Sequence, residues 1–256
     1  MRIAVLDKGE GPAYFRLDDD SSATPFTAPP YAGGVPDERA PKVSFTPSDL
    51  RAPVRPTKVL CVGRNYAAHA KELGNEVPKE PLLFLKPPTA VIGPEGTVRL
   101  PPESERVEHE VELAVVVGKR ATRVSREEAL AHVLGYTVAC DVTARDLQRK
   151  DVQFTRAKGF DTFCPVGPWI ETELHTGDLA ISCTVSGSRR QDGRTRDMVF
   201  DVPTLVSAMS HAMTLEPGDL LLTGTPEGVG PLVDGDRLEV AIEGIGALTV
   251  RVEKLA

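Results

Sequence analysis

The chain has 256 residues, of which 41% are apolar and 26% are charged, and its formal net charge is −7. These proportions are typical of a globular protein with a large core. An acidic chain without a long block of Lys and Arg predicts no nucleic-acid partner, because phosphate binding needs clustered positive charge. The densest basic stretch, residues 188–196, predicts a solvated hairpin.

The sequence carries no sign of a membrane segment or an export signal. No stretch approaches the roughly 20 apolar residues that span a bilayer. The N-terminal segment MRIAVLDKGEG does not resemble a signal peptide. Cys61, Cys140, Cys164 and Cys183 form no C-x-x-C pair, which is typical of reduced thiols. We therefore expect a cytoplasmic protein that contacts no membrane.

The N-terminal part differs in pattern from the rest of the chain. Residues 2–7 and 13–18 predict two short strands around the turn KGEG. Residues 21–57 are rich in Pro, Ser, Thr, Gly and Asp without helical or strand periodicity, so they predict an irregular connector. We expect residues 1–55 to form a small N-terminal β unit with its connector, and residues 56–256 to form the main domain.

Short strands and a few short helices follow one another through the main domain. Strands are predicted at 58–63, 81–87, 107–117, 135–142, in a hairpin from 180, and from 219 onward. Helices are predicted at 66–73, 125–133, 143–150 and 203–213. The helix at 125–133 opens with a capping box, Ser125 and Glu128. This order favours an α+β fold, with a mixed sheet rolled on itself, over a doubly wound layout.

Three carboxylates alternate in the segment RVEHEVELAVVVGK, residues 106–119. Glu108, Glu110 and Glu112 would project from one side of a strand, where like charges repel. A solvated edge strand is one explanation, but the apolar run after Glu112 favours a strand buried on both faces. There a cation would resolve the repulsion, and Glu110, Glu112 and Asp141 could form an oxygen-only site for Mg²⁺ or Mn²⁺. A helix N-cap is the alternative role of Asp141.

Several other residues can take part in chemistry, and each also has an ordinary explanation. His69 and Glu72 share a helix face, so the carboxylate can bind the imidazole and prepare a general base; a surface pair is the alternative. His109 points away from Glu110 and predicts a packing or hydrogen-bonding residue. Thr225 lies in TGTPEGVG, a loop without a nucleotide-binding pattern, and its hydroxyl can hold a carboxylate.

The order of six sequence blocks resembles the fumarylacetoacetate hydrolase superfamily. The blocks are CVGRNYAAHAKE, FLKPPTAVIGP, HEVELAVVVGK, GYTVACDVTARDLQ, RAKGFDTFCPVGPWI and LEPGDLLLTGTPEGVGP. The likeness covers residues 58–252 and is closest to a branch of acylpyruvate hydrolases, oxaloacetate decarboxylases and 2-hydroxyhepta-2,4-diene-1,7-dioate isomerases. It implies a mixed β-roll for the catalytic domain, residues 56–256, and a homodimer. One departure is Phe154, where the family often has Trp.

The same resemblance implies roles for individual residues. The metal, Mg²⁺ or Mn²⁺, would be held by Glu110, Glu112 and Asp141. The catalytic residues would be His69 and Glu72, which form a dyad on a short lid helix, and Lys158. The substrate-binding residues would be Arg64, Arg145, Gln148, Lys158 and Thr225.

The implied substrate is a small 2-oxo acid. Three carboxylates and a divalent cation leave about one negative charge, which Lys158 and Arg145 would offset when an anionic substrate binds. We expect hydrolysis of the C–C bond of 2,4-dioxo acids, of the acylpyruvate or fumarylpyruvate type, through a metal-stabilised enolate. Decarboxylation of oxaloacetate and isomerisation of the dienedioate use the same enolate and are the alternatives. A protein that binds the metal and a 2-oxo acid without catalysis is the alternative from another class.

Overall fold

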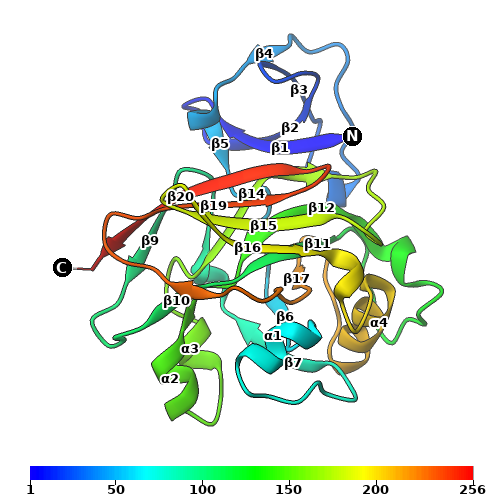
Figure 1. Ribbon diagram of the computed structural model, residues 1–256. Helices are drawn as coiled ribbons and strands as arrows, with labels where there is room; N and C mark the ends of the chain where they lie inside the picture. Colours follow the sequence, from blue (N-terminus) through cyan, green and yellow to red (C-terminus); the bar gives the residue numbers. More distant parts are fainter. Residues whose placement is uncertain (256) are drawn as a thin grey trace.

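The computed structural model describes residues 1–255, and β-strands are its main regular element (Figure 1). The N-terminal strands are β1 (Arg2–Asp7), β2 (Pro12–Leu17), β3 (Ser22–Pro25), β4 (Val43–Ser44) and β5 (Leu50–Arg51). The central strands are β6 (Val59–Gly63), β7 (Leu82–Lys86), β8 (Val91–Ile92), β9 (Thr97–Leu100), β10 (Val107–His109), β11 (Val111–Val117), β12 (Val133–Cys140), β13 (Thr143–Ala144) and β14 (Cys164–Glu171). The C-terminal strands are β15 (Ala180–Val185), β16 (Ser188–Arg194), β17 (Leu220–Leu222), β18 (Gly230–Pro231), β19 (Arg237–Ile242) and β20 (Gly246–Lys254).

Helices are few and short. The α-helices are α1 (Ala67–Glu72), α2 (Arg145–Lys150), α3 (Thr155–Lys158) and α4 (Val202–Ala212). The 3₁₀ turns are η1 (Pro30–Ala32), η2 (Pro47–Asp49), η3 (Pro88–Ala90), η4 (Ala129–His132) and η5 (Thr195–Asp197). The four α-helices found within residues 1–255 lie on the side of the molecule opposite the N-terminal strands (Figure 1).

In the described part of the chain the strands form two large sheets and one small sheet. The largest runs in the order β4-β3-β2-β1-β14-β12-β11-β17-β6-β7, with β5 paired to β1 and β8 paired to β14. The second runs β16-β15-β19-β20-β9, and the small sheet is β13-β10-β18. Most neighbours are antiparallel, whereas β17–β6, β20–β9 and β14–β8 are parallel. Mixed sheets with few helices confirm the predicted α+β fold.

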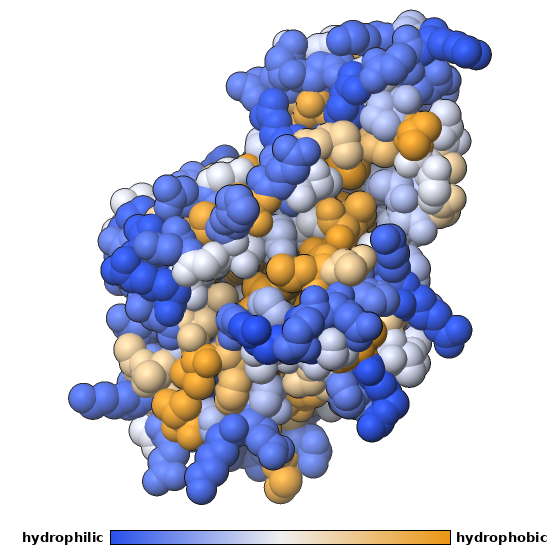
Figure 2. Space-filling model, turned by 90° about the vertical axis from the view of Figure 1, so that its right-hand side faces the viewer, coloured by the Kyte–Doolittle hydropathy of each residue, from blue (hydrophilic) through white to orange (hydrophobic). Residues whose placement is uncertain are grey.

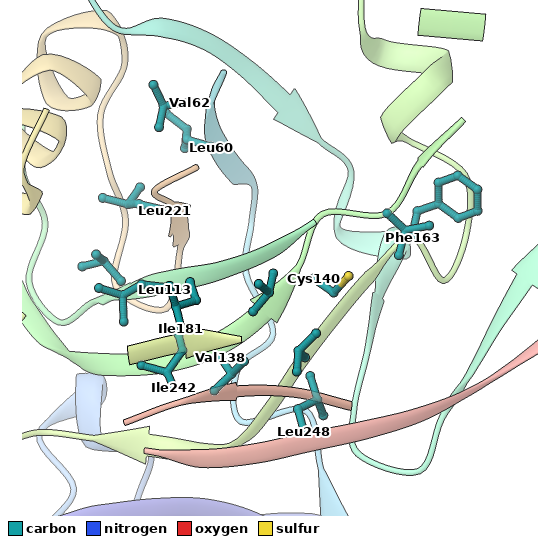
Figure 3. Close-up of a cluster of buried hydrophobic side chains, with 14 of the residues drawn as sticks. Leu60, Val62, Leu113, Val138, Cys140, Phe163, Ile181, Leu221, Ile242 and Leu248 are labelled. Atoms are coloured by element: carbon teal, nitrogen blue, oxygen red, sulfur yellow. The ribbon is translucent and has the colours of Figure 1, made fainter. Parts of the chain in front are cut away.

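The main core lies between the two large sheets (Figure 3). Leu113 from β11 and Val138 from β12 belong to one buried cluster with Ile181 from β15 and Ile242 from β19. The opposite face of β11 carries Ala114 into a second buried cluster. Burying a Leu, Ile or Val side chain stabilises the fold by about 1.5–3 kcal/mol. The sheet that carries the candidate site is therefore fixed by packing on both faces.

The strand that bears the alternating carboxylates is an inner strand. β11 pairs with β12 on one side and with β17 on the other, and each of its seven residues is buried. The explanation by a solvated edge strand is therefore wrong. The predicted strand at 107–117 is also divided at Glu110, which separates β10 from β11. At this break the backbone N–H of Asp141 donates to the carbonyl of Glu110 at 2.8 Å.

Two other predicted elements differ from the structure. Residues 125–133 form turns and η4 instead of an α-helix. The capping box is present, because Glu128 N–H donates to Ser125 Oγ at 3.3 Å and Ser125 N–H to Glu128 Oε2 at 3.2 Å. The chain enters β12 at Val133, however, and so short a segment gains too few helical hydrogen bonds to offset nucleation. The predicted irregular connector contains β3, β4 and β5, strands of two to four residues that are too short to show alternation.

The N-terminal strands have a small core of their own but continue the large sheet. Phe15, Leu17 and Phe45 belong to this separate buried cluster. β1 pairs with β14, and Arg2 lies opposite Glu171. The N-terminal strands are therefore hydrogen-bonded to the strands of the central sheet. The division into residues 1–55 and 56–256 stays a prediction.

Polar residues cover most of the face shown in Figure 2, and apolar residues gather in the waist below the N-terminal strands. No helix among residues 1–255 combines the length and apolar character needed to cross a membrane. The expected homodimer and cytoplasmic location stay predictions.

Candidate active site

Glu110, Glu112 and Asp141 lie together where β11 begins and β12 ends. The two strands are antiparallel with Val111 opposite Cys140, so their register brings these three side chains to one place. One carboxylate oxygen from each residue lies within 4.8 Å of those of the other two, and all three side chains are buried. The structure therefore gathers the three predicted ligands into a single oxygen-rich cluster.

Two buried lysines neutralise part of this cluster. Lys158 Nζ donates to Glu110 Oε2 at 3.0 Å, to Asp141 Oδ2 at 2.6 Å and to Thr143 Oγ1 at 2.8 Å. Burial disfavours its charged form, but Asp141 and Glu110 outweigh this cost and raise the pKa of Lys158 above its usual value. Lys86 Nζ donates to Asp141 Oδ1 at 2.5 Å from the end of β7. Sequence reasoning missed Lys86; the available signal was a lysine that ends an apolar strand before two prolines.

Arg145 explains how Glu108 and Glu110 can both be buried. Its Nε donates to Glu108 Oε2 at 2.7 Å, and its Nη2 donates to Glu110 Oε1. Arg106 Nε adds a second bond to Glu108, at 2.6 Å. Burial works against the charged form of Glu110, but Lys158 and Arg145 dominate and hold its pKa below the usual range. Glu108 is thus neutralised by two arginines and stands apart from the carboxylate cluster.

Glu112 is the carboxylate of the cluster that forms no ion pair with residues 1–255. Its Oε2 accepts from the backbone N–H of Gly224 at 2.5 Å. Burial, and then the negative charges of Asp141 and Glu110, raise its pKa well above the usual value. A buried carboxylate in this position calls for a further cation, and three carboxylates form the all-oxygen donor set that Mg²⁺ and Mn²⁺ prefer. The residues present therefore fit the predicted metal.

The turn that follows β17 requires glycine at position 224. Gly224 has φ +92°, and a Cβ atom there would lie 2.7 Å from Cβ of Asn65. Asn65 is buried and holds this turn, because its Nδ2 donates to the carbonyl of Thr223 at 2.7 Å. The close approach places the Gly224 N–H on Glu112.

His69 and Glu72 form the predicted pair on α1. His69 Nδ1 lies 3.3 Å from Glu72 Oε2, and Glu72 Oε1 accepts from the backbone N–H of Gly228 at 3.0 Å. Only 5% of His69 is exposed, so the alternative of a surface pair is wrong for the imidazole. α1 ends at Glu72, within the predicted helix at 66–73, and Gly74 follows its C-cap Leu73 with φ +71°. Glu72 therefore connects the imidazole to the loop after β17.

A cavity of about 230 Å³ joins these groups. Of the predicted site residues, those that line it are Arg64, His69, Glu110, Glu112, Asp141, Arg145, Gln148, Lys158 and Thr225. Glu72 does not line the cavity itself but contacts the His69 imidazole. The structure thus brings the whole predicted set together, while the role of each residue in binding or catalysis stays a prediction.

Two aromatic rings form an apolar wall that sequence reasoning did not single out as such. Phe84 and Phe154 both line the cavity and meet edge to face, with ring centroids 5.6 Å apart. Lys158 Nζ lies 4.9 Å from the centre of the Phe84 ring. The cavity is smaller than the roughly 300–1,000 Å³ that hold drug-sized ligands. Its size therefore suits a small molecule.

The chain matches the family model of the fumarylacetoacetate (FAA) hydrolase C-terminal domain over residues 58–253. The chain belongs to the fumarylacetoacetate hydrolase family. Membership confirms the resemblance drawn from the six sequence blocks.

Relatives within the family have several different activities in their names. A 5-carboxymethyl-2-hydroxymuconate delta-isomerase from Mycobacterium smegmatis is 42% identical, with a TM-score of 0.90 and full coverage of both chains. Fumarylpyruvate hydrolase from Pseudomonas aeruginosa, in complex with Mn²⁺ and pyruvate, is 39% identical with a TM-score of 0.73, covering 80% of this chain and 91% of its own. A mitochondrial oxaloacetate tautomerase from Arabidopsis thaliana is 46% identical over 77% of this chain and 92% of its own. These named enzymes support an enzymatic role for this family member.

Proposed function

We propose that this chain is a divalent-metal-dependent enzyme that interconverts the keto and enol forms of a small 2-oxo dicarboxylic acid such as oxaloacetate. The observation that carries the proposal is the position of His69. A buried imidazole, held by Glu72, shares a cavity of about 230 Å³ with three clustered carboxylates. The similarity to an oxaloacetate tautomerase supports this substrate class.

Glu110, Glu112 and Asp141 would hold the cation. When bound, Mg²⁺ or Mn²⁺ supplies Lewis-acid chemistry that polarises a carbonyl oxygen. The similar fumarylpyruvate hydrolase, whose complex contains Mn²⁺ and pyruvate, supports the pairing of this metal with a 2-oxo acid. A small cavity favours pyruvate-like and oxaloacetate-like acids over long substrates.

Lys158 supplies fixed positive charge and does not act as the base. Its pKa is raised by Asp141 and Glu110 in spite of burial, so the ammonium keeps its proton. In that state it stabilises negative charge as it develops on the substrate. Arg145 is held by Glu108 and Glu110, and its Nη1 donates to Gln148 Oε1 at the cavity wall. These side chains are ready to orient the carboxylate of an incoming acid.

His69 is the base in this proposal. With Nδ1 hydrogen-bonded to Glu72, the neutral imidazole has Nε2 free to accept a proton. Nε2 removes a proton from the carbon beside the keto group, and the imidazolium formed returns that proton to the keto oxygen, so the enol forms without loss of atoms and His69 is neutral again. A positioned base of this kind contributes about 10²–10⁴-fold in rate.

Hydrolysis of 2,4-dioxo acids is the second candidate. The same His69–Glu72 pair could activate a water that attacks the distal carbonyl, which breaks the C–C bond and leaves a pyruvate enolate. The likeness to a fumarylpyruvate hydrolase favours it. Decarboxylation of oxaloacetate and isomerisation of a dienedioate follow as further alternatives. A binding protein without catalysis would not need the buried imidazole.

A comparison of substrates tests the proposal. The protein loaded with Mn²⁺ would be offered oxaloacetate, fumarylpyruvate and the dienedioate separately, and kcat/KM measured for each. Ultraviolet absorbance of the enol separates tautomerisation from decarboxylation, which releases pyruvate. We expect tautomerisation of oxaloacetate to have the highest kcat/KM. A higher value for fumarylpyruvate cleavage would replace the first candidate by the second, and inactivity toward all three would refute both.

A further inference from the structure

Gln191 is a buried amide in a strand that is otherwise mostly exposed. It lies in the middle of β16 with no exposed surface, in the basic hairpin that the sequence predicts to be solvated. It does not line the cavity. An amide without partners would destabilise a buried position, so its hydrogen bonds show what the residue holds in place.

The orientation of the Gln191 amide is fixed by backbone groups. Its Oε1 accepts from the backbone N–H of Val111 at 3.1 Å and from His109 Nδ1 at 3.0 Å. Its Nε2 donates to the carbonyl of Pro226 at 2.8 Å and to Thr225 Oγ1 at 2.8 Å. A backbone N–H can only donate and a carbonyl can only accept, so the reverse orientation is excluded. All four hydrogen-bonding positions of the amide are used.

This orientation decides the direction of the Thr225 hydroxyl. Thr225 Oγ1 is the acceptor of the Gln191 bond, so its own hydrogen must point elsewhere. Among residues 1–255 no oxygen accepts that hydrogen, and Thr225 lines the cavity. A hydroxyl is normally free to donate or accept; here it is left as a donor to whatever occupies the cavity.

We propose that Gln191 is a positioning residue that sets Thr225 as a hydrogen-bond donor to the carboxylate of the substrate. The inference rests on the proposed function, because it requires a 2-oxo acid in the cavity. Gln191 also binds His109 and Val111, the neighbours of Glu110 on either side, so one side chain ties the substrate donor to the carboxylate cluster. It acts through Thr225 and touches no reacting atom.

The isosteric substitution Gln191→Glu tests this role. The new carboxylate cannot donate to Thr225, so the threonine hydroxyl turns and donates to it instead of to the ligand. A hydrogen bond to a charged group is lost, which corresponds to about 10- to 100-fold weaker binding. We would measure the Kd of pyruvate by calorimetry with the Mn²⁺-loaded protein, and the Kd of Mn²⁺ alone. Pyruvate affinity should fall by about this factor while Mn²⁺ affinity changes less than about threefold.

A double-mutant cycle separates positioning from a structural role. Gln191→Glu would be combined with Thr225→Val, which removes the hydroxyl, and with Thr225→Ser, which keeps it. With Val at 225 the Gln191 substitution should change pyruvate affinity by less than about twofold, whereas with Ser the full loss should return. Equal losses in the three backgrounds would overturn the proposal, because the effect would then not pass through Thr225.

The outcomes also separate this inference from the proposed function. If the unaltered protein binds no pyruvate and does not act on oxaloacetate, the proposed function fails and the inference fails with it. If it binds pyruvate but the cycle is additive, only the inference fails. Should Gln191→Glu not fold, a crystal structure of the unaltered protein with pyruvate decides. A carboxylate oxygen within about 3.2 Å of Thr225 Oγ1 supports the inference, and its absence overturns it.

Discussion

Replacing Glu112 by Gln is expected to stabilise the metal-free protein while it weakens the binding of Mn²⁺. Glu112 is buried beside Asp141 and Glu110, and a backbone N–H is its hydrogen-bond donor. Without a metal, the charges of Asp141 and Glu110 force Glu112 to hold a proton, whereas the amide is neutral without one. Its oxygen can still accept from the backbone N–H of Gly224. Glu112→Gln should therefore raise the free energy of unfolding of the metal-free protein and lower the affinity of the protein for Mn²⁺.

The size of the effect follows from the spacing of the carboxylates. Their oxygens lie within 4.8 Å of one another, and two unit charges at that distance repel by about 3.5 kcal/mol at an effective dielectric constant of about 20. Lys158 and Lys86 screen part of this repulsion, so we expect a gain of about 1–3 kcal/mol in the free energy of unfolding. Residues that only hydrogen-bond to a metal ligand contribute about 10–100-fold to metal affinity, so loss of a ligand itself should weaken Mn²⁺ binding by more than about 100-fold.

The assay is urea unfolding with EDTA or with Mn²⁺. At Mn²⁺ about 100-fold above its Kd, the unaltered protein gains about 2.7 kcal/mol, whereas a variant with 100-fold weaker affinity gains about 0.4 kcal/mol. A pH series adds a check of sign. Above pH 4.5 the unfolded Glu112 has lost its proton while the folded one keeps it, so metal-free stability falls as pH rises. The variant should lack this slope.

Glu108→Gln is the matched control. Glu108 is also buried on this part of the sheet, but it is paired with Arg145 and Arg106. Its substitution should destabilise the metal-free protein, because a buried arginine loses a partner, and Mn²⁺ affinity should change only a few fold. If Glu112→Gln instead destabilised the empty protein and left Mn²⁺ affinity unaltered, our account of the cluster would be wrong.

Three further substitutions probe the base, the support of Asp141 and the turn after β17. His69→Ala should lower kcat/KM for oxaloacetate by about 10²–10⁴-fold with calorimetric Mn²⁺ affinity unchanged; a parallel loss of affinity would contradict its role as base. Lys86→Met should destabilise the fold by about 3 kcal/mol in urea, because Asp141 loses one of two buried partners, and a change below about 1 kcal/mol would refute this. Gly224→Ala should cost about 2 kcal/mol or more in thermal unfolding, since φ is +92° and Asn65 is in the way; an unchanged Tm would show that the turn adapts.

Much of the fold and the content of the cavity could be predicted because their signals are local. The apolar run of β11 indicated burial on both faces, and its alternation placed Glu110 and Glu112 in one region. The spacing of His69 and Glu72 on a helix predicted a contact that the structure contains at 3.3 Å. Asp141 was a candidate third ligand on the same local grounds, and the family resemblance added roles for Arg64, Arg145, Gln148 and Lys158. The cavity collects these residues.

The missed features depend on contacts between distant parts of the chain. Lys86 meets Asp141 across 55 positions, and Gln191 meets Thr225 across 34. The sequence next to Gln191 gives no sign that its side chain faces inward, and the sequence next to Lys86 gives only the position of this lysine at the end of an apolar strand. The helix predicted at 125–133 fails for a related reason, because its capping box forms but the next strand begins too soon. At 125–133 the local preference for a helix is therefore overridden by the strand β12, which begins at Val133.

The floor and the rim of the cavity come from different kinds of structural element. Its floor belongs to the densely packed centre of the molecule, where Glu112 lies on β11 and Asp141 directly follows β12. Both strands are paired with a neighbour on each side. Its rim comes from Leu73, Asn75 and Arg149, at the ends of short helices. Substitutions at the rim can therefore change the length and polarity of the molecule that the cavity admits, while the strands that carry Glu112 and lead to Asp141 stay as they are.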